Sequence, residues 1–446
     1  MRERSGKHVS GNRGGTVLIV TIWVVLVLAG LALVFARSTR VALIVSCNQV
    51  GSLAAECTAA GAMAYIQAQL RSNTEASVFV SSAPYEGMQI GDGRFWVLRS
   101  NPEDDLQHDY GLTDEAGKIN LNSASMEVLL KLPGMTAELA SSIIDWRDGD
   151  DELSPGGAES EYYLLLKEPY NCKNGSLETM EEVLLIKGAS EAILYGEDTN
   201  LNGILDENEN DGDGSDPPDN RDGRLERGIY HYATVYSIEP NTDKAGQRRI
   251  DITDMNNQRQ LGDMMRELLG GDRYLEVMES IRRSRPRNII DFYYRSGLKI
   301  EEFEQIADRL TTSRAETITG LVNVNTASKE VLMCLPGLEE SDAEALVAYR
   351  KSNQGLDTIT WITKVLEQDK AIEAGGAITT RSFQYSADIA AASADGRAYK
   401  RVKAVFDTRE SGAKVVYWKS MTHFGWPLEQ GVLAQGRRDG VAAAGM

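Results

Sequence analysis

The chain has 446 residues, of which 42% are apolar, and its formal net charge is −19. A chain of this length can bury a sizeable core and is expected to form two or more domains. The acidic balance argues against binding to nucleic acid or to an anionic membrane surface, because both require basic patches.

The N-terminus joins a short basic leader to a long apolar stretch. Residues 1–15 carry four basic side chains against one acid and end in Gly14-Gly15, and residues 16–36 contain no charge. About 20 apolar residues cross a bilayer, and basic residues before the first helix keep that end in the cytoplasm. Two interpretations fit: an ordinary signal anchor, or a type IV pilin-like precursor. In the second, a prepilin peptidase cuts between Gly15 and Thr16, or one residue earlier after Gly14, and the helix is retained.

The segment after the apolar stretch predicts a continued helix and then strands. No proline occurs between residues 37 and 70, so one helix is expected from Thr16 to about Leu70. Short β-branched and aromatic segments at 77–82 and 93–100 predict strands. A long N-terminal helix followed by strands is typical of a pilin.

An internal repeat follows, because residues 119–149 match residues 322–352 almost position by position. Each copy has an N-x-N segment, a helix, a Pro-Gly hairpin and a second helix, which resembles the helix-hairpin-helix motif. A fainter copy lies at 176–196. The expected caps and hairpins are Asn122-Ser123, Asn325-Thr326, Pro133-Gly134 and Pro336-Gly337.

Helix-hairpin-helix units often bind DNA through a glycine-rich hairpin, but these hairpins argue against that role. The second glycine of a DNA-binding hairpin is replaced by Thr136 and Glu339. The acids that follow Glu339 would face phosphate with like charge. We therefore expect a module that contacts protein and binds no nucleic acid. A membrane-anchored DNA-uptake receptor is the alternative function.

The acidic segment 197–228 matches a calcium-binding loop. An EF-hand-type loop needs oxygen ligands at alternating positions, a glycine at position six and an acid at position twelve. Gly203 stands at position six. The predicted Ca²⁺ ligands are Asp198, Asn200, Asn202, the Ile204 carbonyl, Asp206 and Glu209. A second, less regular site is expected from Asp211, Asp213, Asp219 and Asp222. The alternative is a solvated acidic linker.

Cysteines and histidines form no catalytic or zinc pattern, so the chain is not expected to be an enzyme. Cys47 and Cys57 are ten residues apart on one predicted helix, about 15 Å, which exceeds the reach of a disulfide. Pairing of Cys172 with Cys334 stays open. The acids of "DWRDGDD", at 145–151, are expected to cap helices or bind cations.

The C-terminal part, 382–427, predicts three antiparallel strands with turns near Asp395-Gly396 and Ser411-Gly412. The predicted fold class is therefore α+β: a pilin-like domain, with a long N-terminal helix packed on an antiparallel sheet, and a large inserted helical domain. The expected divisions are a leader 1–15, a transmembrane part 16–36, a first pilin-like part 37–118, an insertion 119–375, C-terminal strands 376–430 and a tail 431–446.

The whole pattern resembles the type II secretion minor pseudopilin K family, also called general secretion pathway protein K. The resemblance rests on "RGGTVLIVTIW", "DEAGKINLNSAS", "SIIDWRDGDDELSPGGAESEYY", "VNVNTASKEVL" and the acidic loop. It implies a tip subunit of the pseudopilus, anchored once in the inner membrane with its soluble domain in the periplasm. It also implies partnership with minor pseudopilins I and J, a secreted protein as a candidate substrate, and bound Ca²⁺.

The same resemblance explains the residue at mature position five. Most pilins carry a glutamate there, whose buried charge is tolerated when it pairs with the N-terminal amine of a neighbouring subunit. After cleavage at Gly15 this position is Val20. A subunit with no neighbour ahead of it has no amine to pair, so the absence of the glutamate favours a position at a filament tip.

Overall fold

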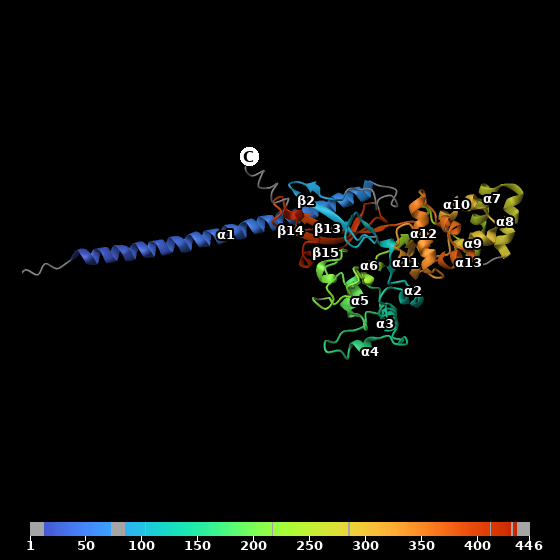
Figure 1. Cartoon of the computed structure of the whole chain (residues 1–446). Helices are drawn as coiled ribbons and strands as arrows, with labels where there is room; N and C mark the ends of the chain where they lie inside the picture. Colours follow the sequence, from blue (N-terminus) through green and yellow to red (C-terminus); the bar gives the residue numbers. More distant parts are fainter. Residues whose placement is uncertain are drawn as a thin grey trace, which may run out of the picture.

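The computed structural model describes residues 13–72, 85–102, 104–215, 217–283, 286–410, 412–429 and 431–434. The predicted leader up to residue 12, the predicted strand at 77–82 and the tail from residue 435 lie outside the described residues. The protein combines a long helix, an antiparallel sheet and an inserted, mostly helical domain (Figure 1), which is the predicted α+β pilin-like fold.

Helix α1 (Arg13–Ser72) runs for 60 residues without a break, so the predicted cleavage bond after Gly15 lies inside it. Its first half projects away from the rest of the molecule, and its large apolar side chains from Val17 to Leu53 are exposed (Figure 1). Among the described residues, α1 is the one helix long and apolar enough to cross a membrane.

The second half of α1 packs on the sheet. Its buried side chains recur every three or four residues, which places them on one face of the helix; they are Ala55, Ala59, Ala62, Ile66 and Leu70. Four of them, from Ala59 to Leu70, join Phe95 and Val97 of the sheet in one hydrophobic cluster. The small alanines let the helix axis come close to the strands.

The main sheet is antiparallel and has the strand order β1-β2-β13-β14-β15, with β3 beside β2 and β4 beside β13. The strands are β1 (Met88–Ile90), β2 (Gly93–Arg99), β3 (Asp109–Tyr110), β4 (Thr113–Asp114), β13 (Gln384–Ala392), β14 (Tyr399–Asp407) and β15 (Lys414–Ser420). Tyr385 pairs with Asp114, so the chain leaves the sheet at β4 and returns directly beside it at β13. Everything between these two strands is an insertion into the pilin-like domain.

The insertion contains three units that each begin and end in a parallel two-strand pair. Unit 1 (119–234) pairs β5 (Ile119–Asn120) with β6 (Ala233–Thr234). Unit 2 (250–311) pairs β8 (Ile250–Asp251) with β9 (Leu310–Thr311). Unit 3 (322–379) pairs β11 (Val322–Asn323) with β12 (Ile378–Thr379). In each unit, the carbonyl of the closing threonine accepts a hydrogen bond from the residue after the first strand, at 2.9–3.0 Å.

Helical hairpins fill the space between the two strands of each unit. Unit 1 holds α2 (Met126–Leu130), α3 (Ala137–Arg147), α4 (Ser160–Tyr163), η3 (Met180–Leu185), α5 (Glu191–Tyr195), η4 (Glu207–Glu209) and α6 (Ile229–Tyr232). Unit 2 holds η5 (Met255–Asn257), α7 (Gln258–Leu269), α8 (Gly271–Arg283), α9 (Ile289–Ser296), α10 (Ile300–Glu304) and η6 (Ala307–Arg309). Unit 3 holds α11 (Lys329–Cys334), α12 (Glu340–Ser352), η7 (Ile359–Lys364) and α13 (Gln368–Ala374).

The remaining elements are short connections. They are η2 (Glu115–Gly117), the antiparallel pair β7 (Ile238–Pro240) and β10 (Thr317–Thr319), and η8 (Thr422–Phe424).

The predicted helix caps were wrong by two or three residues. Ser125 caps α2 by accepting a hydrogen bond from the Val128 amide, and Ser328 caps α11 in the same way. A cap must directly precede the first helical residue, and Asn122 and Asn325 come too early in the chain. Their side chains instead fix the following loop: each amide group donates to a backbone carbonyl, Leu177 or Leu356, at 3.0 and 2.9 Å.

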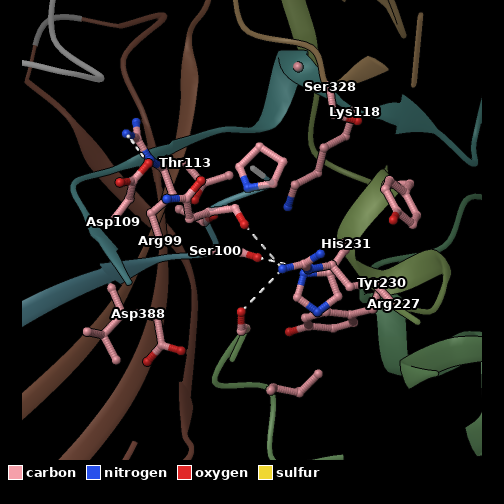
Figure 2. A pocket seen from close by; sticks show the side chains of 18 of the residues that line it. Arg99, Ser100, Asp109, Thr113, Lys118, Arg227, Tyr230, His231, Ser328 and Asp388 are labelled. Atoms are coloured by element: carbon pink, nitrogen blue, oxygen red, sulfur yellow. Dashed lines mark hydrogen bonds and ion pairs between the residues drawn. The ribbon is translucent and has the colours of Figure 1, made fainter. Parts of the chain in front are cut away.

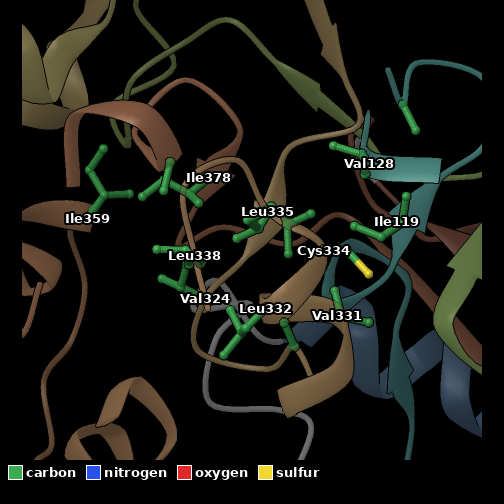
Figure 3. Close-up of a cluster of buried hydrophobic side chains, with 14 of the residues drawn as sticks. Ile119, Val128, Val324, Val331, Leu332, Cys334, Leu335, Leu338, Ile359 and Ile378 are labelled. Atoms are coloured by element: carbon green, nitrogen blue, oxygen red, sulfur yellow. The ribbon is translucent and has the colours of Figure 1, made fainter. Parts of the chain in front are cut away.

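One hydrophobic cluster runs through all three units. Figure 3 shows its part in unit 3, where Val331, Leu332 and Leu335 lie with Ile119 and Val128 of unit 1. Cys334 belongs to this cluster, and both Cys334 and Cys172 are buried free thiols. The pairing that the sequence left open is therefore not formed in the structure.

Candidate metal centre

The predicted calcium loop lies between α5 and α6 of unit 1, and its backbone wraps around its own side chains. The Asp198 carboxylate accepts hydrogen bonds from the amides of Asn202, at 2.9 Å, and Gly203, at 3.0 Å. Gly203 has a φ of +75°, a left-handed conformation that glycine adopts without strain. A glycine at position six is thus what the turn of this loop requires.

The predicted ligand side chains meet at Asp206. Its Oδ2 atom accepts hydrogen bonds from the side-chain amides of Asn200, at 2.6 Å, and Asn202, at 2.9 Å. The backbone amide of Asp206 donates to Glu209 Oε2 at 3.1 Å. The structure therefore brings the five side chains Asp198, Asn200, Asn202, Asp206 and Glu209 into one network, in which donor groups of asparagine occupy the position beside the carboxylate.

Glu209 shows that this network lacks positive charge. Its side chain is 1% exposed, and its Oε1 atom has no hydrogen-bond partner. Burial, together with the negative charges of Asp198 and Asp206, raises the pKa of Glu209 to about 8. An unpaired buried carboxylate oxygen is costly, and an oxygen-seeking cation would remove that cost. The residues present therefore fit a hard cation such as Ca²⁺.

A cation here would need more than carboxylates. Among the described residues, no group of three or more His, Cys, Asp and Glu side chains is arranged to hold a metal. The amide oxygens of Asn200 and Asn202 and the carbonyl of Ile204 would have to complete the ligand set, as they do in loops of this type.

Two side chains from distant parts of the chain fix the loop in place. Arg401 of β14 is fully buried, pairs with Asp388 of β13 at 2.6 Å, and donates to the carbonyls of Asn200 and Leu201 at 2.7 and 2.5 Å. His231 Nε2 lies 2.9 Å from Asp198 Oδ2. Burial lowers the pKa of His231 despite this carboxylate. The loop is thus attached to the centre of the pilin sheet.

The predicted second site is assembled only in part. Asp219 Oδ2 accepts hydrogen bonds from the amides of Asp211 and Gly212, both at 2.8 Å, so Asp211 and Asp219 are neighbours. Asp213 and Asp222 are exposed. Asp222 accepts from the Arg224 amide at 2.8 Å. These hydrogen bonds stabilise turns of the acidic segment.

A cavity of about 520 Å³ lies beside the loop 198–209, between the sheet and units 1 and 3 (Figure 2). Leu201, Asn202 and Gly203 of the loop form part of its wall. Two of its cations are paired: Lys118 Nζ lies 3.0 Å from Glu115 Oε1, and Arg227 Nη2 lies 2.7 Å from Asp105 Oδ1. Burial lowers the pKa of Lys118.

Comparison with known proteins gives matches over separate parts of the chain. Residues 319–371 match the helix-hairpin-helix motif. A segment of 45 residues is 51% identical to ComE operon protein 1 of Bacillus subtilis (strain 168); it covers 10% of this chain and only 22% of that curated relative. Among solved structures, the chain is similar to one from the GspK-GspI-GspJ complex of enterotoxigenic Escherichia coli. The identity is 10%, the coverage is 82% of this chain and 95% of the other, and the TM-score is 0.41.

The most specific match lies in unit 1 and the strand that leads into it. Residues 111–195 match the family described as type II secretion system (T2SS), protein K. They include the first helix-hairpin-helix hairpin, the acids of "DWRDGDD" and the helices up to the edge of the calcium loop. This part of the chain is therefore similar to protein K of the type II secretion system.

Proposed function

We propose that the chain is the tip subunit of a pseudopilus, where it initiates or caps assembly together with minor pseudopilins I and J and so drives export of folded proteins. The observation that carries the proposal is the protein K match over residues 111–195 on a pilin-like fold. Val20 in place of the usual glutamate at mature position five supports a subunit with no neighbour ahead of it.

The shape of the molecule supports the same position. Units 2 and 3 lie beyond the sheet, at the end of the molecule opposite the exposed half of α1 (Figure 1). In a filament held together by its N-terminal helices, this bulk would occupy the place of the next subunit. A subunit of this shape can end a filament more easily than it can continue one.

Co-purification tests the proposal. The full chain, extracted in detergent from cells that also produce minor pseudopilins I and J, is expected to elute with both. The alternative, a DNA-uptake receptor, predicts instead that the chain elutes alone and binds duplex DNA. Micromolar, salt-sensitive binding of DNA in an anisotropy assay, with no pseudopilin retained, would replace the proposal by that alternative.

We also propose that the loop of Asp198, Asn200, Asn202, Ile204, Asp206 and Glu209 binds one Ca²⁺. Two of its ligands are neutral asparagines, so the dissociation constant is expected at about 10⁻⁴–10⁻³ M, as in extracellular modules. Binding to the folded form alone would stabilise it by about 2.7 kcal/mol at a hundredfold excess of calcium over the dissociation constant. The buried, unpaired Oε1 of Glu209 supports the proposal.

Calorimetry and thermal melting of the full chain in detergent test the loop. Glu209→Ala should remove the heat of binding assigned to this site and the corresponding effect of chelator on the melting temperature. Glu207→Ala is the matched control, since Glu207 carries the same charge on the same turn, η4, but is exposed. Equal calcium responses of the wild type and Glu209→Ala would show that the loop is a solvated linker.

A further inference from the structure

The end of the chain covers the face of the sheet opposite α1. Successive side chains of a strand point to opposite faces, and Trp96 of β2 lies outside the cluster that packs on α1. Leu428 and Leu433 join Trp96 in a separate hydrophobic cluster. We call residues 426–429 and 431–434 the strap, because they close this second face of the sheet.

An aromatic contact marks the place where the strap begins. The ring centroid of Trp426 lies 5.6 Å from that of Trp96 and 5.6 Å from that of Tyr399 in β14, and both contacts are edge-to-face. Aromatic pairs prefer this arrangement. The environment of the Trp426 ring therefore reports whether the strap lies on the sheet.

The strap has one hydrogen bond to the rest of the described chain. His108, which directly precedes β3, has its Nε2 atom 3.1 Å from the carbonyl oxygen of Pro427. The other hydrogen bonds of the strap are internal, because Trp426 Nε1 and the Val432 amide both donate to the Glu429 carbonyl. A carbonyl oxygen only accepts, so the proton of the His108 ring lies on Nε2.

The second ring nitrogen of His108 fits only the neutral imidazole. Its Nδ1 atom is buried and has no hydrogen-bond partner. When the ring takes a second proton, both nitrogens become donors. The new donor at Nδ1 would then be buried without an acceptor, which is costly. Once the strap has left the sheet, the ring can bind that proton in contact with water.

The charged groups around His108 do not offset this cost. Burial is the largest influence on the ring and lowers the pKa of His108 from its ordinary value of 6.5. The nearby charges are engaged with other groups or exposed to solvent. They are the pairs Asp388–Arg401, Asp105–Arg227 and Asp109–Arg99, the Asp198 carboxylate beside His231, and Glu429 at the surface of the strap.

We propose that the strap is a pH-dependent cover of the sheet, which is closed while His108 is neutral and is released when His108 takes a second proton. A histidine whose pKa is lower in the closed form stabilises that form fully above the pKa of the released form, about 6.5. This contribution is lost as the pH falls below that value, and the equilibrium constant for closure then decreases by up to about tenfold per pH unit. Release would uncover Trp96, Leu98 and Ala390.

Fluorine NMR tests the cover on the full chain in detergent, with fluorotryptophan in place of tryptophan and chelator in every sample. Trp426→Phe assigns the signal of Trp426. In the wild type, this signal should move from its packed position to its solvent-exposed position as the pH is lowered from 8 to 5. Leu433→Ala removes an apolar contact of the strap, so it should raise the pH at which the transition occurs.

Two histidine variants test the role of His108. His108→Gln keeps an amide donor for the Pro427 carbonyl but takes no proton, so its strap should stay closed over the whole pH range. His423→Gln is the matched control, because His423 is exposed and lies in η8, just before the strap. It should behave as the wild type does. A transition that comes from His231 would persist in His108→Gln and would overturn the proposal.

A second measurement applies if His108→Gln does not fold. The chain has four histidines, so NMR of the wild type with labelled histidine can follow each ring separately. The His108 ring should titrate with the same midpoint as the Trp426 signal. Different midpoints for His108 and Trp426 would reject the proposal.

Trp146 distinguishes release of the strap from unfolding, because it is buried in α3 of unit 1. Its fluorine signal should stay fixed while that of Trp426 moves. If both signals move together, the whole chain unfolds in acid and the proposal is wrong. It is also wrong if the Trp426 signal stays in its packed position down to pH 5 in both the wild type and Leu433→Ala.

Discussion

Arg401 joins two parts of the molecule that are far apart in sequence. Its guanidinium pairs with Asp388 of the sheet and donates to two carbonyls of the loop 198–209. The sequence around Arg401 does not indicate this contact, since an arginine in a strand is ordinarily exposed. The side chains of the loop 198–209 could be singled out from the sequence because their spacing is local. The residues that hold the loop, Arg401 and His231, come from elements that only folding brings together.

We predict that Arg401→Met destabilises the protein by about 3–5 kcal/mol, because it leaves Asp388 inside the structure without its partner. Chemical denaturation of the full chain in detergent measures the change. Arg397→Met is the control: Arg397 lies in the same hairpin, but it is exposed and pairs with Asp395 at 3.7 Å. That surface pair should contribute less than about 1 kcal/mol. Equal effects of the two substitutions would contradict the role given to Arg401.

Asp291 provides a prediction for pH. Burial alone would raise the pKa of Asp291, but hydrogen bonds from the Arg287 amide at 2.8 Å and Arg295 Nε at 2.6 Å hold it below its usual value. A carboxyl group whose pKa is lower in the folded state stabilises the fold at neutral pH. That contribution is lost as pH falls through the folded pKa, below about 4.

The expected result is that Asp291→Asn is less stable than the wild type at pH 7 by about 1.5–3 kcal/mol. The difference in stability between the two proteins should narrow as the pH is lowered from 5 to 3. Denaturation midpoints of both proteins across this range measure it. Arg295 is half exposed, so added salt should reduce its share of the effect. A gap that stays constant with pH would show that the carboxylate charge is not what stabilises the fold.

At the scale of elements, the sequence predicted units 1 and 3 better than unit 2. Their Pro-Gly hairpins and N-x-N segments are strong local signals. Unit 2 has Asp251 in place of the asparagine and Gly270-Gly271 in place of Pro-Gly, so the match disappears although the fold persists. The parallel strand pairs could not be predicted, because two-residue strands have no periodicity and their partners are distant in sequence.

The glycines of the two predicted hairpins have different surroundings. We therefore expect an alanine to destabilise the two hairpins by different amounts. Gly134 and Gly337 both have left-handed backbone, with φ of +70° and +73°. A Cβ atom at Gly134 would meet nothing within 4 Å, whereas one at Gly337 would lie 2.9 Å from the Cβ atom of Glu373 in α13. Gly134→Ala should cost about 1–2 kcal/mol, the strain of left-handed backbone alone.

Gly337→Ala should cost more than Gly134→Ala, because α13 must also move. Chemical denaturation of the two variants of the full chain makes the comparison. Similar losses of stability would mean that α13 shifts at little cost, and the hairpin of unit 3 would then be less tightly packed than the structure indicates.

At the scale of the whole molecule, the prediction concerns the leader. In cells with prepilin peptidase, the chain is expected to lose residues 1–15 and to begin at Thr16, because the basic leader ends in glycine just before the apolar stretch. Intact-mass measurement of the extracted protein decides between processing and an uncleaved anchor. Gly15→Leu should block cleavage, and Gly14→Leu should leave cleavage unchanged. The reverse pattern would place the cut one residue earlier, and an intact Met1 in the unaltered chain would reject processing.

The route of the chain through the sheet also has consequences for biosynthesis. Leu98 of β2 pairs with Asp388 of β13, so β2 is made long before its neighbour exists. Each inserted unit, by contrast, can close as soon as its own second strand has been made. The units can therefore fold while the pilin-like sheet still has an open edge, which is the state most prone to wrong association. A chain that stops before β13 would carry folded inserted units. In the same chain, the alanines Ala55, Ala59 and Ala62 of α1 would lack most of the sheet on which they pack. Proteases and chaperones that remove incomplete chains would recognise this exposed face of α1 and the unpaired edge of β2.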